Sequence, residues 1–119
     1  MRTVLIASDH ATGRELVRVA LEHSGYTVHE AAANEAVSSA HQIQPDLIIL
    51  DWHIKVTETP SIIVEIRRDP QLADVPVMAL IASTLQADHD RAISAGFNGC
   101  LSKPIHLHSL RKEVERLLR

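Results

Sequence analysis

The most informative run in this sequence is Pro45-Asp46-Leu47-Ile48-Ile49-Leu50-Asp51. Its four consecutive aliphatic residues are too few for a convincing helix, and Pro45 marks where the run starts. A short unbroken apolar run is typical of a strand that is buried on both faces, as in a parallel sheet. Asp51 would then lie at the carboxyl end of the strand, the edge of open α/β sheets where ligands bind. Asp51 is therefore either a helix cap or a site residue.

Strands and helices are expected to alternate on both sides of this run. Apolar runs predict further strands at Val4–Ala7, Tyr26–Ala31, Val75–Ala82 and Asn98–Leu101. Apolar residues at helical spacing predict helices at Gly13–Ser24, Ala32–Ile43, Pro60–Arg68, Leu85–Ala95 and beyond Pro104. Such alternation predicts an α/β fold whose parallel sheet has helices on both faces. Right-handed crossovers then favour the doubly wound strand order 2-1-3-4-5.

The composition indicates one ordinary globular domain. The 119 residues are 45% hydrophobic but only 3% aromatic, so the core must be aliphatic. The net charge of -3 gives no sign of direct nucleic-acid or membrane-surface binding. A lone cysteine, Cys100, excludes an internal disulfide and a multi-cysteine zinc site. We see neither a spanning apolar run nor a cleavage pattern, so we expect a soluble intracellular domain without a signal peptide.

Three charged residues are predicted to meet at one edge of the sheet. The strand order places Asp9 and Asp51 side by side at the switch point, and Lys103 lies just beyond the last strand. Two adjacent carboxylates repel each other unless they share a cation or one is protonated. Mg²⁺ is commonly held by one or two carboxylates together with a phosphate. These residues therefore indicate a phosphoryl-transfer site; the alternative is that both acids cap helices and Lys103 is solvated.

Over its whole length the sequence resembles a response-regulator receiver domain of two-component signalling. The matching segments are Val4–Asp9, Pro45–Asp51, Arg67–Pro70, Val75–Leu80, Ala95-Gly96 and Leu101–Pro104. The Pro-Asp-aliphatic-Asp run and the Ser-Lys-Pro run are specific together, although either alone is weak. The resemblance implies that residues 1–119 form a single receiver domain, a flavodoxin-like (βα)5 three-layer sandwich in the cytoplasm.

The resemblance also assigns roles to residues. Asp51 resembles the aspartate that accepts a phosphoryl group from a sensor histidine kinase or phosphotransfer protein, and Lys103 resembles the lysine that contacts this group. Asp9, Asp51 and the backbone carbonyl of His53 correspond to Mg²⁺ ligands. The Lys103–Pro104 peptide is expected to be cis. Such a domain is not an enzyme; it signals by contacts with a downstream effector or output domain, or with a second copy of itself.

Several positions depart from the family pattern. Ser8 stands where a first acid is expected; its hydroxyl can hold a metal-bound water, but one negative charge is lost, so Mg²⁺ is expected to bind weakly. Ile81 replaces the Thr or Ser of the usual switch, and Cys100 replaces its aromatic ring. The segment from His53 to Pro60 lacks the glycines usual in the loop after the acceptor. The coupled rearrangement of hydroxyl and ring is therefore not possible in this chain.

Other readings of the sequence remain open. A pseudo-receiver would use the same fold as a phosphorylation-independent interaction or dimerisation module, and the departures at Ser8, Ile81 and Cys100 motivate it. A doubly wound nucleotide binder or small enzyme lacks support, because no Gly-rich phosphate loop follows the first strand. His10 and His53 could complete a transition-metal site with the acids, but exposed loop histidines are the preferred interpretation.

Overall fold

The computed structural model describes residues 2–52 and 60–118 and contains a five-stranded parallel sheet. Its strand order is β2-β1-β3-β4-β5, as predicted. The strands are β1 (Thr3–Ala7), β2 (Thr27–Ala31), β3 (Leu47–Asp51), β4 (Val77–Ile81) and β5 (Gly99–Ser102). The central position of β3 explains its unbroken apolar run, because all of its residues are buried.

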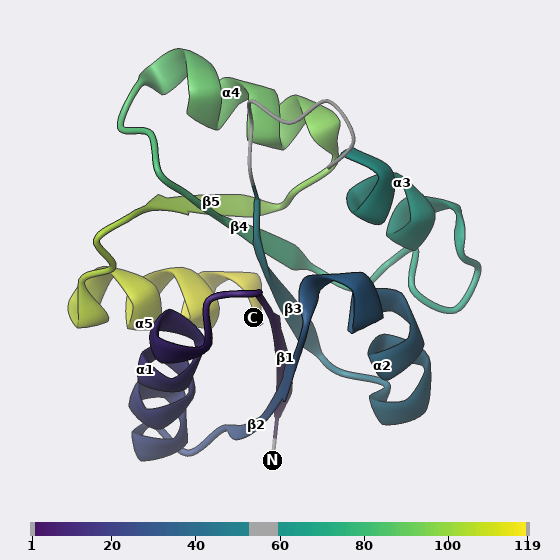
Figure 1. Ribbon diagram of the computed structural model, residues 1–119, viewed down its shortest axis with the longest axis horizontal. Helices are drawn as coiled ribbons and strands as arrows, with labels where there is room; N and C mark the ends of the chain where they lie inside the picture. The colour runs from purple at the N-terminus through teal and green to yellow at the C-terminus, as the bar shows by residue number, and fades with distance from the viewer. Residues whose placement is uncertain (1, 53–59, 119) are drawn as a thin grey trace.

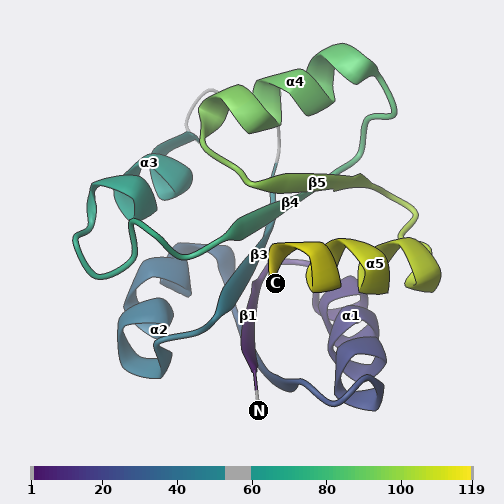
Figure 2. The same ribbon diagram turned by 180° about the vertical axis from the view of Figure 1, so that it is seen from behind.

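Helices cover both faces of this sheet and complete the predicted three layers (Figures 1 and 2). On one face lie α1 (Ala11–His23) and α5 (Leu107–Leu117), which pack beside each other. The other face carries α2 (Ala36–Ile43), α3 (Pro60–Arg68) and α4 (Gln86–Ala95), with a short 3-10 turn, η1 (Ala33–Glu35), before α2. No helix in the described ranges is long and apolar enough to span a membrane.

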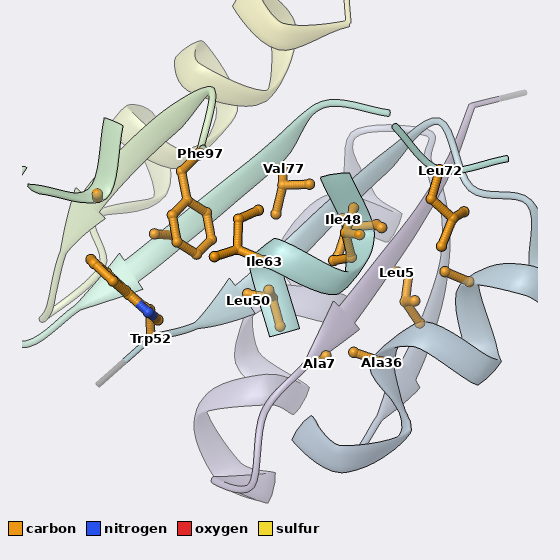
Figure 3. Close-up of a cluster of buried hydrophobic side chains, with 14 of the residues drawn as sticks. Leu5, Ala7, Ala36, Ile48, Leu50, Trp52, Ile63, Leu72, Val77 and Phe97 are labelled. Carbon is orange, nitrogen blue, oxygen red and sulfur yellow. The ribbon is translucent and has the colours of Figure 1, made fainter. Parts of the chain in front are cut away.

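Alternate residues of each strand enter different halves of the core. Leu47 and Ile49 of β3 join the cluster under α1 and α5, whereas Ile48 and Leu50 join the cluster under α2, α3 and α4. This alternation follows from the two-residue period of a strand. In the second cluster, Ile63 of α3 lies between the strand residues and the ring of Phe97 (Figure 3). The core is almost entirely aliphatic, as the composition predicts.

The structure corrects several element boundaries. The predicted strand Val75–Ala82 shortens to β4, because the amide of Val75 turns back to the carbonyl of Leu72 and Pro76 has no N–H to donate. The predicted helix Ala32–Ile43 divides into η1 and α2. The last strand shifts by one residue, to Gly99–Ser102. These differences leave the topology unchanged.

Trp52, which follows the central strand, is buried rather than partly exposed. Its side chain packs against Phe97 with ring centroids 5.1 Å apart and planes tilted by 52° (Figure 3). The indole therefore anchors the chain immediately after Asp51 to the aliphatic core.

Candidate functional site

Asp51 is the last residue of β3 and lies in register with Leu80 of β4. Its side chain is only 5% exposed. A buried carboxylate is strongly unfavourable unless it is paired and hydrogen-bonded. The contacts of Asp51 therefore define the chemistry of this edge of the sheet.

Lys103 supplies the compensating charge. Its ammonium Nζ lies 2.7 Å from each carboxylate oxygen of Asp51, so one cation serves both oxygens. The backbone helps to place this side chain, because the amide of Lys103 donates to the carbonyl of Ile81 at 2.7 Å. The Lys103–Pro104 peptide is cis, as the resemblance implied. Topology thus brings together the acid and the lysine that the sequence separates by 52 positions.

Ser8 makes a further contact with the Asp51 carboxylate. Its hydroxyl donates to Oδ2 of Asp51 at 3.1 Å and accepts from the backbone amide of His10 at 3.0 Å. Ser8 is itself buried, with 3% exposed. The hydroxyl replaces a repulsive second carboxylate with a hydrogen-bond donor, so the Asp51–Lys103 pair is stabilised without a metal ion.

Asp9 follows Ser8 at the same edge but makes a different contact. Its Oδ1 accepts a hydrogen bond of 3.1 Å from the backbone amide of Ala33, at the first residue of η1. Asp9 does not cap the helix that follows it, as the alternative from the sequence had it, because α1 has no side-chain capping bond; it accepts from the first amide of η1 instead. Its carboxylate remains exposed at the rim of the site.

A cavity of about 250 Å³ opens beside the Asp51–Lys103 pair. Its walls come from β1, α1, β4 and the segment after Lys103, and they are largely apolar. Gly13 of α1 contributes to this space, because a Cβ at that position would meet nothing within 4 Å. The cavity is large enough to admit a small reactant to the edge of the site, since a cavity of about 150 Å³ accommodates benzene.

Comparison with known proteins identifies the family. The model of the response regulator receiver domain matches residues 4–115. The chain belongs to this family. The receiver is 31% identical over 99% of its length to the phosphate regulon regulator PhoB of Pseudomonas aeruginosa, of which it covers 52%. It is 30% identical over 98% of its length to the polar-differentiation regulator DivK of Brucella ovis, covering 96% of that protein.

Solved receiver structures agree with this assignment. The chemotaxis regulator CheY4 of Vibrio cholerae superposes with a TM-score of 0.88 at 28% identity, covering 99% of each chain. The receiver domain of sensor histidine kinase PA1611 from Pseudomonas aeruginosa superposes with a TM-score of 0.85 at 30% identity, covering 98% of this chain and 97% of that one. The latter structure holds a magnesium ion in its active-site cleft. The present chain is thus a receiver of phosphorelay signal transduction, and it spans about half the length of the PhoB relatives.

Ile81 and Cys100, the two positions at which the sequence departs from the usual switch residues, lie on neighbouring strands of the sheet. Ile81 ends β4 and is fully buried in the apolar core. Cys100 lies in β5 and is half-buried; burial, with a smaller contribution from Glu113, raises the pKa of its thiol to about 11. A thiol with this pKa is almost wholly protonated at neutral pH, so Cys100 is a packing residue rather than a nucleophile.

The histidine-metal hypothesis finds no support in the described residues. Within ranges 2–52 and 60–118, no three or more His, Cys, Asp and Glu side chains gather in a way that could hold a metal ion. His10 lies at the rim and its amide bonds Ser8. The backbone carbonyl of His53 is an expected Mg²⁺ ligand, and His53 lies outside the described residues.

Sequence reasoning missed one hydrogen-bonded group near the site. The hydroxyl of Ser102, next to Lys103, contacts the carbonyl of Ser83 at 2.6 Å and Nε2 of His89 at 2.7 Å. These residues show no shared periodicity, and each is unremarkable by type. Only the register of β5 beside β4 would have suggested that Ser102 lies close to the start of α4.

Proposed function

We propose that this receiver accepts a phosphoryl group on Asp51 from a phosphohistidine of a sensor histidine kinase or phosphotransfer protein, and signals by protein contacts. The observation that carries the proposal is the bidentate pair between Lys103 and the buried carboxylate at the end of the central strand. The match to the response regulator receiver domain supports this proposal, as does the likeness to the receiver domain of a sensor histidine kinase.

The reaction asks little covalent chemistry of the protein. A carboxylate oxygen of Asp51 attacks phosphorus, the bond from phosphorus to the histidine nitrogen breaks, and the product is an acyl phosphate on Asp51. Catalysis of such transfers rests on positioning and charge neutralisation. Lys103 supplies a fixed positive charge within reach of the reacting oxygens, and the fixed end of β3 holds the nucleophile in place.

Mg²⁺ fits the oxygen donors of this edge, but with one charge fewer than the family pattern. Asp9 and Asp51 supply carboxylates, Ser8 supplies a hydroxyl that can hold a metal-bound water, and the His53 carbonyl is the third expected ligand. When bound, the ion would neutralise charge on the phosphoryl oxygens. Lys103 and Ser8 already occupy the Asp51 carboxylate, so the cation must compete with both contacts. We therefore expect weak Mg²⁺ binding.

Two exposed apolar regions suit partner contacts. Leu16 of α1 is 57% exposed and borders the cavity beside Asp51, and Leu107 of α5 is 45% exposed. We assign the phosphodonor protein to this side, because it adjoins the acceptor. Leu85 and Ile93, at α4, are 65% and 52% exposed. We assign the downstream effector, or a second copy of the chain, to the α4 side.

The proposal is tested by incubating the chain with acetyl phosphate and Mg²⁺ and recording its intact mass. The expected result is a Mg²⁺-dependent gain of about 80 Da for one phosphoryl group. Asp51→Asn should abolish this gain, whereas Asp90→Asn, at an exposed position of α4, should leave it unchanged. No gain with acetyl phosphate or with a phosphorylated phosphotransfer domain would favour the phosphorylation-independent pseudo-receiver instead.

A further inference from the structure

Ser102 of β5 joins two other segments of the chain through its hydroxyl. The oxygen lies 2.6 Å from the carbonyl oxygen of Ser83, in the loop before α4, and 2.7 Å from Nε2 of His89 within α4. A carbonyl can only accept, so the single hydroxyl proton of Ser102 is donated to Ser83. His89 must therefore donate its Nε2–H to Ser102. Both the neutral Nε2–H tautomer and the imidazolium can do so, so this bond does not depend on the charge of His89.

This bonded group adjoins the acceptor site along the chain. Ser102 immediately precedes Lys103, whose ammonium contacts both oxygens of Asp51 and whose amide donates to Ile81. The peptide bond holds consecutive Cα atoms about 3.8 Å apart. A shift of the Lys103 backbone is therefore passed to Ser102 and to its bond with His89, whereas a turn of the lysine side chain alone is not. The contact of Lys103 with Asp51 and the contact of Ser102 with His89 of α4 are thus made by consecutive residues.

Helix α4 is attached to the domain mainly toward its C-terminal end, where Ala92 and Ala95 pack on the core and Arg67 donates to the carbonyl of the C-cap Gly96 at 2.9 Å. Ala92 is its one buried residue, and the helix is described in full from Gln86 to Ala95. Leu85, at its N-cap, makes no side-chain capping bond and is exposed, as is Ile93. Elements with little buried apolar surface open at low free-energy cost. The partly buried hydrogen bond from His89 is therefore one of the contacts that hold α4, and it lies toward the N-terminal half of the helix.

We propose that His89 is a positioning residue that couples α4 to Lys103 through Ser102, taking the place of the hydroxyl missing at Ile81 and the ring missing at Cys100. The signal it carries rests on the proposed phosphorylation of Asp51. In this proposal the segment at Lys103 shifts as its ammonium moves from the carboxylate toward phosphoryl oxygens, Ser102 moves with that segment, the bond to His89 weakens, and α4 becomes freer to open. The conformational response then appears at the exposed residues of α4.

The first test is hydrogen exchange of the α4 amides, measured by NMR before and after treatment with acetyl phosphate and Mg²⁺. His89→Ala should raise α4 exchange about fivefold in the unmodified protein, the factor expected for one net hydrogen bond. His89→Gln keeps an amide donor near the Nε2 position and should stay within about twofold of the parent. His23→Ala removes an exposed histidine from α1 and serves as the control.

Phosphorylation should raise α4 exchange at least threefold in the parent and in His89→Gln, but less than twofold in His89→Ala. Intact mass shows in parallel whether each variant has gained a phosphoryl group. A full α4 response in phosphorylated His89→Ala would overturn the coupling. The same result in Ser102→Ala would do so independently, because that variant removes the hydroxyl shared by both bonds.

A double-mutant comparison decides the coupling even if Asp51 accepts no phosphoryl group. Lys103→Met removes the contact to Asp51, so it should raise α4 exchange in the parent relative to the amides of β3, which report global opening. In the His89→Ala background, adding Lys103→Met should change the ratio of α4 to β3 amide exchange rates by less than about twofold. Equal changes of this ratio in both backgrounds would refute the coupling, whereas an absent mass gain refutes only the proposed phosphorylation.

Discussion

Replacing Lys103 by methionine tests the electrostatic core of the site. The variant keeps most of the aliphatic side-chain length but leaves the carboxylate of Asp51 buried without a cation, since its side chain is only 5% exposed. Breaking a fully buried pair costs about 3–5 kcal/mol. Lys103 is 33% exposed and Ser8 still donates to Asp51, so we expect the smaller value of about 2 kcal/mol.

Urea unfolding at pH 7 measures this loss directly, and thermal unfolding should show a Tm lower by roughly 6–10 °C for a domain of this size. Lys112→Met, at an exposed position of α5, is the matched control and should change the free energy of unfolding by less than about 0.5 kcal/mol. The comparison removes any general effect of exchanging lysine for methionine.

The pair also predicts an asymmetry between its two partners. Asp51→Asn alone should cost less than about 1 kcal/mol, because the partly exposed Lys103 can turn its ammonium to water. Adding Asp51→Asn to Lys103→Met should restore at least half of the lost stability, because the stranded charge is removed. If Lys103→Met proves as mild as the Lys112 control, or if Asp51→Asn fails to rescue it, Asp51 is not a buried charge that depends on Lys103.

Two further predictions concern parts of the domain away from the site. His41 donates hydrogen bonds to Oε1 of Gln71 and Oδ2 of Asp69, and these bonds raise its pKa; their stabilisation is complete below the unfolded value of 6.5 and is lost as pH rises through the folded pKa. The urea midpoint should therefore decline above pH 6.5 in the parent more than in His41→Gln; parallel profiles would contradict this. Gly96→Ala should destabilise by about 1–2 kcal/mol because φ at Gly96 is +120°, whereas Gly13→Ala, in α1 with open space around its Cβ, should stabilise by about 0.5–1 kcal/mol. Equal urea midpoints for the two alanine variants would refute that contrast.

The sheet could be predicted from the sequence because strands and helices place apolar residues in regular patterns. The run Leu47–Leu50 is unbroken only because β3 is central and buried on both faces, and the alternation of strands with helices then leaves few topologies. Strand order placed Lys103 at the same edge of the sheet as Asp51, but β4 lies between β3 and β5, so the contact itself did not follow from strand order. Boundaries were less certain, as at Val75, because a strand ends where local hydrogen bonds compete with the ladder.

The hydrogen-bond partners of side chains at the edge of the sheet could not be predicted from apolar patterns and strand order. The strand order places both Ser8 and Asp9 beside Asp51, but only backbone direction decides that Ser8 donates to the carboxylate while Asp9 turns to Ala33. The contact between Ser102 and His89 joins residues 13 positions apart whose types suggest nothing in sequence. Such contacts depend on rotamers and loop paths, which leave no periodic trace.

Ser8 gives the site around Asp51 one negative charge fewer than an acid at the same position would. With an acid there, three carboxylates would share one lysine, and a divalent cation would relieve their repulsion. With Ser8, the charges of Asp51 and Lys103 balance within their own contacts, and the hydroxyl adds a hydrogen bond in place of repulsion. Under the proposed phosphorylation of Asp51, the phosphoryl group would add negative charge beside a lysine that the carboxylate already engages, so Lys103 would have to leave the carboxylate to meet it. The replacement of an acid by Ser8 would then make the movement of Lys103 a larger part of the proposed response.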